Sequence, residues 1–216
     1  MFRFFNSVEN ISNEDMQKIW GHILAGEIKS PNTYSYRTLE KLKNMTQREA
    51  EHFQLVSSLA LQHSGKKFIL SDNAILKKYN VYFSHLLELE ECGLMTAQTI
   101  SLTLTVSADQ PGAIYNSELI GLIYGKKTEI EEVKVSVHVF TESGSQLITA
   151  IHPKVNSQYF IDCLESINEK YKNFVVTAHD INYISDEGEI NFNSANVLST
   201  EDVENKNGNI LVTENQ

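Results

Sequence analysis

The side chains best suited to catalysis or metal binding are scattered along the chain without a recognisable spacing. The histidines lack the i, i+4 pairing with which one helix face presents two imidazoles to a metal ion. They stand at His22, His52, His63, His85, His138, His152 and His179. The chain also lacks HExxH, CxxC and GxSxG motifs and the glycine patterns of phosphate-binding loops. We therefore predict no catalytic residue, no metal site and no cofactor, and interpret Cys92 and Cys163 as free thiols.

The most patterned stretch is IWGHILAGEIKSPNTYSYRTLEKL, and its candidate binding residues are Trp20, Glu27, Tyr34 and Arg37. Trp20 falls on the apolar stripe of a predicted helix, which Pro31 ends because proline lacks an amide proton. Glu27 and Arg37 would face each other if the helices on either side of this turn pack antiparallel. We favour an ion pair that clamps the two helices over a functional site. Arg37→Ala is then expected to lower the melting temperature.

Candidate contacts to nucleic acid are four lysines: Lys66, Lys67, Lys77 and Lys78. Three predicted helices and a following hairpin have the order of a winged helix-turn-helix, and HVFTESGSQL is similar to a wing strand with its turn. However, the helix in the recognition position, VYFSHLLELEECG, has three glutamates and no Lys or Arg, whereas phosphate and base contacts need cations. We interpret the module as winged-helix-like in shape, with protein contact favoured over DNA contact.

The overall charge also argues against nucleic acid as the partner. The 216 residues include 18 Lys and Arg against 28 Asp and Glu, a formal net charge of −10, whereas nucleic-acid binding draws most of its affinity from cations. No apolar run approaches the roughly 20 residues needed to span a bilayer, and the first residues lack the apolar region of a signal peptide. We expect a cytoplasmic protein that binds a protein partner or itself, and no membrane.

Hydrophobic staples mark the expected helix starts. In this motif an apolar residue precedes a Ser or Thr cap and another follows the cap by four positions. The predicted caps are Ser12, Ser35, Thr46 and Ser71, with acids three positions after two of them at Asp15 and Glu49. These signals predict helices over residues 12–28, 35–44, 46–62, 72–79 and 81–92. Gly93 is expected to end the last of these helices.

After residue 94 the apolar period changes from that of a helix to that of a strand. The segments TISLTLTV, ELIGLIYG and EEVKVSVHVF read as strands, SQYFIDCLESINEKY as a helix and NFVVTAHDI as a last strand. We predict an α+β fold with a helical N-terminal half followed by a winged-helix-like module with an antiparallel sheet. The expected domains are a helical subdomain (1–64), a winged-helix-like α+β subdomain packed on it (65–184) and an acidic, mobile tail (185–216).

The segment from FFNSVENISNEDMQKIW to QREAEHF resembles a bacterial family designated domain of unknown function 2806. That family has the run F-F-x(5)-I-S-x-E-x-M-Q-x-L-W-x-x-I-L-A-G-E followed by P-G-x-[FY]-S-x-R-T. Trp20, Glu27 and Arg37 match it here, and Asn32 replaces the usual turn glycine. Members carry a segment before the Phe-Phe pair, so we expect a shortened member. The resemblance implies a bacterial or phage-associated setting and no known activity.

Three functional hypotheses follow. We favour a non-enzymatic protein-interaction or scaffold module, supported by the phenylalanines Phe2, Phe4 and Phe5 near the start of the chain. The alternative is a winged-helix nucleic-acid-binding regulator, for which a contiguous positive stripe around residues 66–92 would speak. An enzyme of unrecognised type would need a deep pocket that joins Glu27, Arg37 and a histidine.

Overall fold

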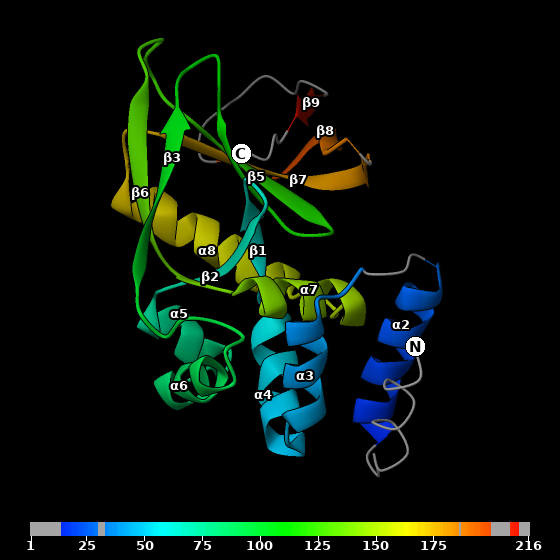
Figure 1. Cartoon of the computed structure of the whole chain (residues 1–216). Coiled ribbons are helices and arrows are strands. Elements are labelled where there is room, and N and C mark those ends of the chain that lie inside the picture. Colours follow the sequence, from blue (N-terminus) through cyan, green and yellow to red (C-terminus); the bar gives the residue numbers. More distant parts are fainter. Residues whose placement is uncertain (1–13, 30–32, 186, 200–207, 212–216) are drawn as a thin grey trace. The chain divides into compact units, whose positions relative to one another are not determined.

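The computed structural model describes residues 14–29, 33–185, 187–199 and 208–211 (Figure 1). Its contacts divide the chain into two compact units, each discontinuous in sequence. Unit 1 consists of Met1–Ser58, Tyr82–Ala97 and Phe140–Lys154, and unit 2 of Leu59–Val81, Gln98–Val139 and Val155–Gln216. Helices together with an antiparallel sheet confirm the predicted α+β class.

Unit 1 is built from helices: α2 (Glu14–Lys29), α3 (Tyr36–Asn44), α4 (Gln47–Ser57), α6 (Phe83–Glu91) and α7 (Glu142–Ile151). Helices α2 and α3 each pack against α7, and α4 packs against α6. The α4 side chain Phe53 meets Phe140 edge-on, with ring centroids 6.3 Å apart. Leu86 and Leu89 of α6 are almost fully buried in this core. The apolar stripes of short helices thus close over one another, which stabilises helices too short to persist alone.

Two of the four predicted helix caps are confirmed. Ser35 caps α3, and Thr46 caps α4 in a capping box with Glu49. The cap of α5 (Asn73–Lys78) is Asp72 rather than the predicted Ser71, because the Asp72 carboxylate accepts from the amides of Ala74 and Ile75. The predicted cap Ser12 lies outside the described residues.

Gly93 ends α6, as predicted. Its φ of +67° lies in the left-handed region that glycine adopts without strain. The amide of Gly93 donates to the Glu90 carbonyl and that of Leu94 to the Leu89 carbonyl, the two bonds of a Schellman motif. The chain therefore turns sharply at the end of this helix.

The predicted third helix is too long. It ends at Ser57, and strand β1 (Leu61–His63) follows where residues 58–62 were expected to be helical. Ser64 and Gly65 both have positive φ, +45° and +71°, which suits the tight turn of a β-hairpin to strand β2 (Lys66–Leu70). The turn chemistry of Ser64 and Gly65 outweighs the apolar spacing that continued the helical pattern.

The predicted wing turn is wrong as well. Within HVFTESGSQL, strand β6 (Glu131–Val139) ends and helix α7 begins. Thr141 caps this helix, because its hydroxyl accepts from the Gly144 amide at 3.2 Å. The Thr and Ser residues that suggested a turn therefore start a helix instead.

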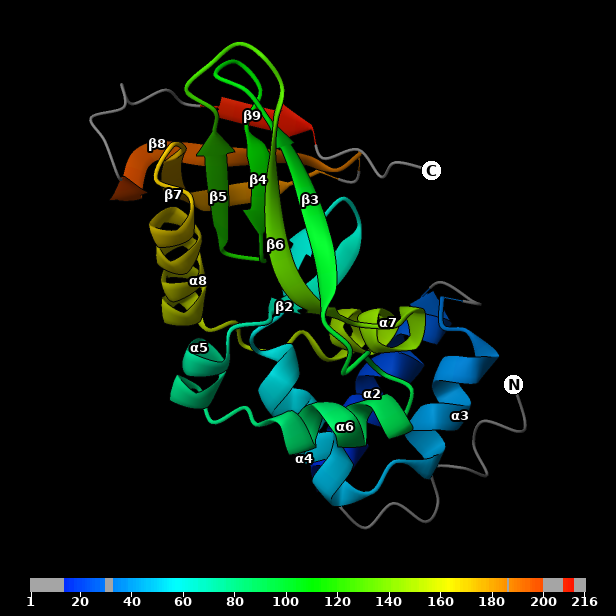
Figure 2. The same cartoon turned by 90° about the vertical axis from the view of Figure 1, so that its left-hand side faces the viewer.

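Unit 2 contains one antiparallel sheet, in which strands β3 and β6 lie side by side in Figure 2. Across the described residues the strand order is β3-β6-β2-β1-β4-β5-β7-β8-β9. Its other strands are β3 (Ile100–Val106), β4 (Gly112–Tyr115), β5 (Leu119–Tyr124), β7 (Val175–Ile184), β8 (Glu189–Ser199) and β9 (Gly208–Leu211). Strand β6 has the predicted alternation, with Val133, Val135 and Val137 buried. His138 lies outside this alternation of valines, yet it is 4% exposed and pairs with the buried Ile69 of β2.

Helix α8 (Ser157–Lys170) packs on strands β5 and β7. Gly121 of β5 permits this approach, because a Cβ there would lie 2.6 Å from Leu164 Cδ2. The hydroxyl oxygen of Tyr159, a buried side chain of α8, accepts a hydrogen bond from the Leu70 amide at 2.9 Å. These contacts position α8 along the sheet.

The segment expected as a tail contributes strands to this sheet. Strand β8 pairs with β7, and Ile190 and Phe192 are buried with Tyr115, Ile120 and Leu122. Most residues after 185 are polar, so the alternation of β8 that buries Ile190 and Phe192 is difficult to recognise in the sequence. None of the described helices has both the length and the apolar character that spanning a bilayer requires.

Candidate functional site

Two of the four candidate binding residues, Trp20 and Tyr34, pack against other residues of unit 1. Trp20 is 2% exposed in the core. Tyr34 is half-buried and lies against α2 at Gly26, where a Cβ would come within 2.8 Å of the Tyr34 hydroxyl oxygen. The glycine of this stretch therefore makes room for the tyrosine.

The structure describes the side chain of only one member of the predicted ion pair, Arg37, and not that of Glu27. Arg37 is exposed on the first turn of α3, and Glu27 belongs to α2 with its side chain outside the description. The pair stays a prediction.

The S-x-R-T stretch anchors the start of α3 to α7. The Ser35 hydroxyl accepts from the Thr38 amide at 3.1 Å. Gln146 of α7 presents its Oε1 to the Ser35 amide at 3.0 Å and to the Thr38 hydroxyl at 2.7 Å. Thr38 is fully buried, so these bonds satisfy polar groups that would otherwise be desolvated without partners. Sequence reasoning missed Gln146 because it lies far along the chain.

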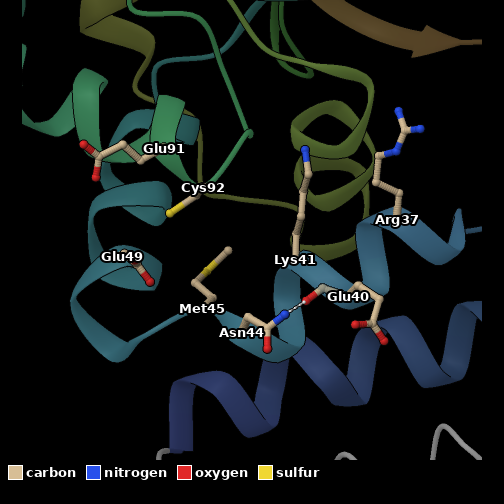
Figure 3. A pocket seen from close by; sticks show the side chains of 8 residues that line it. All are labelled: Arg37, Glu40, Lys41, Asn44, Met45, Glu49, Glu91 and Cys92. Atoms are coloured by element: carbon tan, nitrogen blue, oxygen red, sulfur yellow. Dashed lines mark hydrogen bonds between the residues drawn. The ribbon is translucent and has the colours of Figure 1, made fainter.

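An open cavity of about 400 Å³ lies beside these helices in unit 1 (Figure 3). It is lined by Arg37, Glu40, Lys41, Asn44, Met45, Glu49, Glu91 and Cys92. In Figure 3, Arg37 and Lys41 extend in the same direction from α3. Lys41 Nζ donates to the Gly93 carbonyl, and burial together with the Arg37 charge lowers the Lys41 pKa. The lining includes Arg37 and, among the described residues, no histidine, and the Glu27 side chain lies outside the description. The pocket that joins Glu27, Arg37 and a histidine stays a prediction.

Cys92 is not an activated nucleophile. Burial, reinforced by the nearby Glu49, Glu88 and Glu91 carboxylates, raises the pKa of its thiol to about 12. At neutral pH the sulfur therefore stays protonated, whereas cysteine chemistry needs the thiolate. Cys163 is buried in unit 2, where burial also raises its pKa.

Glu88 of α6 is held by two side chains of α4. Arg48 Nε donates to Glu88 Oε1 at 2.8 Å, and His52 Nδ1 contacts Glu88 Oε2. The hydrogen bond with His52, followed by those with Arg48, outweighs burial and lowers the pKa of the Glu88 carboxyl. Glu88 is therefore ionised and already paired within unit 1.

Two histidines stack beside Glu88. The rings of His52 and His85 lie 4.2 Å apart at an angle of 27°, and Tyr82 meets His85 edge-on at 5.5 Å. Burial and the neighbouring His52 lower the His85 pKa. Among the described residues no group of three or more His, Cys, Asp or Glu is arranged to hold a metal ion. We interpret this cluster as the packing that fixes α4 against α6.

The lysines proposed for nucleic acid lie in unit 2, on β2 and at the end of α5. Lys66, Lys77 and Lys78 are exposed, and Lys67 is half-buried. Lys78 Nζ lies 2.5 Å from Asp162 Oδ2, which also accepts from the Tyr79 hydroxyl at 2.7 Å. Burial opposes ionisation of Asp162, but the bonds from Lys78, Gln158 and Tyr79 prevail and lower its pKa. One of the four cations is therefore already neutralised by a carboxylate.

Helix α6 presents an apolar surface to solvent. Its apolar side chains differ in exposure, because Leu86 is 1% exposed, whereas Phe83 is 60% and Leu87 42% exposed. Phe83, Leu87, Glu90 and Glu91 are exposed at positions i, i+4, i+7 and i+8 and share an arc of about 100°. We call these four residues the α6 face.

Comparison with protein-family models matches residues 1–164 to the family described as Protein of unknown function (DUF2806). The match contains every segment of unit 1, and therefore both the cavity and the α6 face. Neither the curated proteins nor the solved structures contain a match to the chain.

Proposed function

The chain belongs to the family described as Protein of unknown function (DUF2806), and from that starting point we propose that it is a non-enzymatic protein-interaction module. The α6 face carries this proposal. Large apolar side chains normally gain stability by leaving water, yet Phe83 and Leu87 are exposed one helical turn apart, with Tyr82 48% exposed beside them. An adjoining group of exposed apolar side chains is typical of a surface that another protein covers.

The chemistry of unit 1 supports binding over catalysis. The half-buried Cys92 thiol is protonated, and the Glu88 carboxylate is already hydrogen-bonded to Arg48 and His52. Neither group is left to act on a substrate. A bacterial or phage-associated setting and a cytoplasmic location belong to the same proposal, supported by the family resemblance and by the two free cysteines.

Site-specific photo-crosslinking tests the interaction role. A benzophenone amino acid replaces Phe83 in one variant and Tyr183 of β7, which is 54% exposed, in a matched control. We expect crosslinked protein species from position 83 that are missing from position 183, and mass spectrometry then separates a second copy of the chain from a different partner. Equal crosslinking from both positions would remove the support that the α6 face gives.

The alternative function is a winged-helix-like regulator that binds nucleic acid. Its support is the exposure of Lys66 and Lys77, against which stand the Lys78–Asp162 ion pair and the net charge of −10. A mobility shift with random duplex DNA at low salt decides it, because contacts to phosphate strengthen as salt is removed. Absence of any shift at low salt eliminates this alternative.

A further inference from the structure

The α6 face has a charge as well as an apolar character. Helix α6 reads FSHLLELEE and contains no Lys or Arg. Of its three glutamates, Glu88 is paired with Arg48 and His52, which leaves Glu90 and Glu91 on the exposed arc with Phe83 and Leu87. The surface therefore combines an apolar pair with two carboxylates.

The position of these carboxylates in the helix is unfavourable in the isolated chain. A helix C-terminus carries partial negative charge, so acidic side chains in the last turn are repelled by it and basic ones are favoured. Lys41 offsets this at one point, because its Nζ donates to the Gly93 carbonyl beyond the helix end. That cation bonds the backbone, and Glu90 and Glu91 remain exposed.

One of the two carboxylates is held in place before any partner arrives. Glu90 Oε1 accepts the Ala97 amide at 3.0 Å, which restricts the side chain while its remaining lone pairs stay available. Such preorganisation lowers the entropy that a partner must remove on binding. Phe83 and Leu87 are one turn apart on the same helix, a ridge that packs into the groove of another helix.

We propose that the α6 face binds a cationic amphipathic helix, whose apolar side covers Phe83 and Leu87 and whose Lys or Arg side chains reach Glu90 and Glu91. This inference rests on the proposed interaction function and specifies its partner. The partner's cations supply the positive charge that the last turn of α6 lacks. Opposite charges at the rim of such a contact fix its register and speed its formation.

The test uses the full chain and a fluorescent synthetic helix of about 18 residues, roughly five turns, with leucine on one side and lysine on the other. A second peptide has glutamate in place of every lysine. We expect anisotropy titrations to show binding of the lysine peptide and none of the glutamate peptide. The Phe83→Ser/Leu87→Ser variant should weaken binding at least about tenfold, and Glu90→Gln/Glu91→Gln by roughly three- to tenfold.

Matched variants separate this surface from general attraction to an acidic protein. Glu165→Gln/Glu169→Gln removes two exposed carboxylates of α8, and Ile130→Ser removes a side chain that is 72% exposed. Both should bind the lysine peptide as the unmodified chain does. Glutamine at position 90 can still accept the Ala97 amide, and melting curves establish that each variant is folded.

The outcomes distinguish this inference from the function on which it rests. If both peptides bind equally and Phe83→Ser/Leu87→Ser abolishes this binding, the result contradicts a cationic partner. It still supports the α6 face as an interaction surface. Binding of the lysine peptide that is indifferent to all α6 variants, or no binding at all, contradicts the inference. Photo-crosslinking from position 83 tests the proposed interaction function without either peptide.

Discussion

At the scale of single residues, the three glutamates of α6 differ in exposure and in hydrogen bonding. The sequence presents Glu88, Glu90 and Glu91 as one acidic group that disfavours DNA. In the structure Glu88 is 13% exposed at its side chain and bonded to Arg48 and His52, whereas the other two are exposed. Residue types and spacing do not reveal this division, because it depends on which side of α6 meets α4.

Glu88→Gln should lower the free energy of unfolding at pH 7 by about 1 kcal/mol, since it removes the charge from the hydrogen bonds with Arg48 and His52. The folded-state pKa of Glu88 lies below its ordinary 4.5. Its ionic contribution is therefore present above pH 4.5 and is lost as the pH falls through the folded-state value. Denaturant titrations across this range should show the two proteins converging at acidic pH.

Glu169→Gln on the exposed side of α8 serves as the control, with no expected change at either pH. A stability difference for Glu88→Gln that persists unchanged below its folded-state pKa would show that the carboxylate acts through packing instead of charge.

At the scale of elements, the caps of α3 and α4 and the alternation of β6 were predictable, whereas the β1–β2 hairpin and α7 were not. Ser35, Thr46 and Gly93 act through local hydrogen bonds, which a short window of sequence contains. The β1–β2 hairpin and α7 were missed because their patterns overlap those of neighbouring elements. Leu59 and Ala60 continue the apolar stripe of the preceding helix, and Thr141 begins a segment typical of a turn.

The two glycines of α2 provide an element-scale prediction. Gly21→Ala should raise stability by about 0.5–1 kcal/mol, because nothing lies within 4 Å of the added Cβ and alanine favours the helix. Gly26→Ala should instead lower stability by about 1 kcal/mol or more, because its Cβ would overlap the Tyr34 ring. Thermal unfolding of the two variants compares the same substitution in one helix.

The Tyr34→Ala/Gly26→Ala double variant tests the cause. If overlap with the ring is responsible, Gly26→Ala should cost less in the Tyr34→Ala background than in the unmodified chain. Equal costs in both backgrounds would assign the effect to α2 itself.

At the scale of the whole molecule, the region matched to the family ends inside α8, although the sheet continues beyond it. Strand β7 lies between β5 and β8, and Ile190 and Phe192 of β8 are buried in the same cluster as Ile120 and Leu122. Sequence composition assigned these last strands to a tail, because their pairing partners are distant and their exposed residues are polar. Long-range pairing of this kind has no local signal.

A chain truncated after residue 164 should therefore lose the cooperative unfolding of unit 2. It retains β5 but not β7, which leaves the apolar side chains of β5 without their neighbours. Near-ultraviolet circular dichroism and binding of a hydrophobic dye measure the loss. A chain truncated after residue 199 keeps β7 and β8 and should remain close to the full chain; similar behaviour of both truncations would contradict this role for β7.

The discontinuity of the two units has a consequence for how the protein is made. The chain passes from one unit to the other after Ser58, Val81, Ala97, Val139 and Lys154. Helix α7, which both α2 and α3 contact, is among the last parts of unit 1 to leave the ribosome. Helices α2 and α3 therefore lack this packing partner until most strands of the sheet have been synthesised. We expect the two units to complete their folding together after translation instead of one after the other.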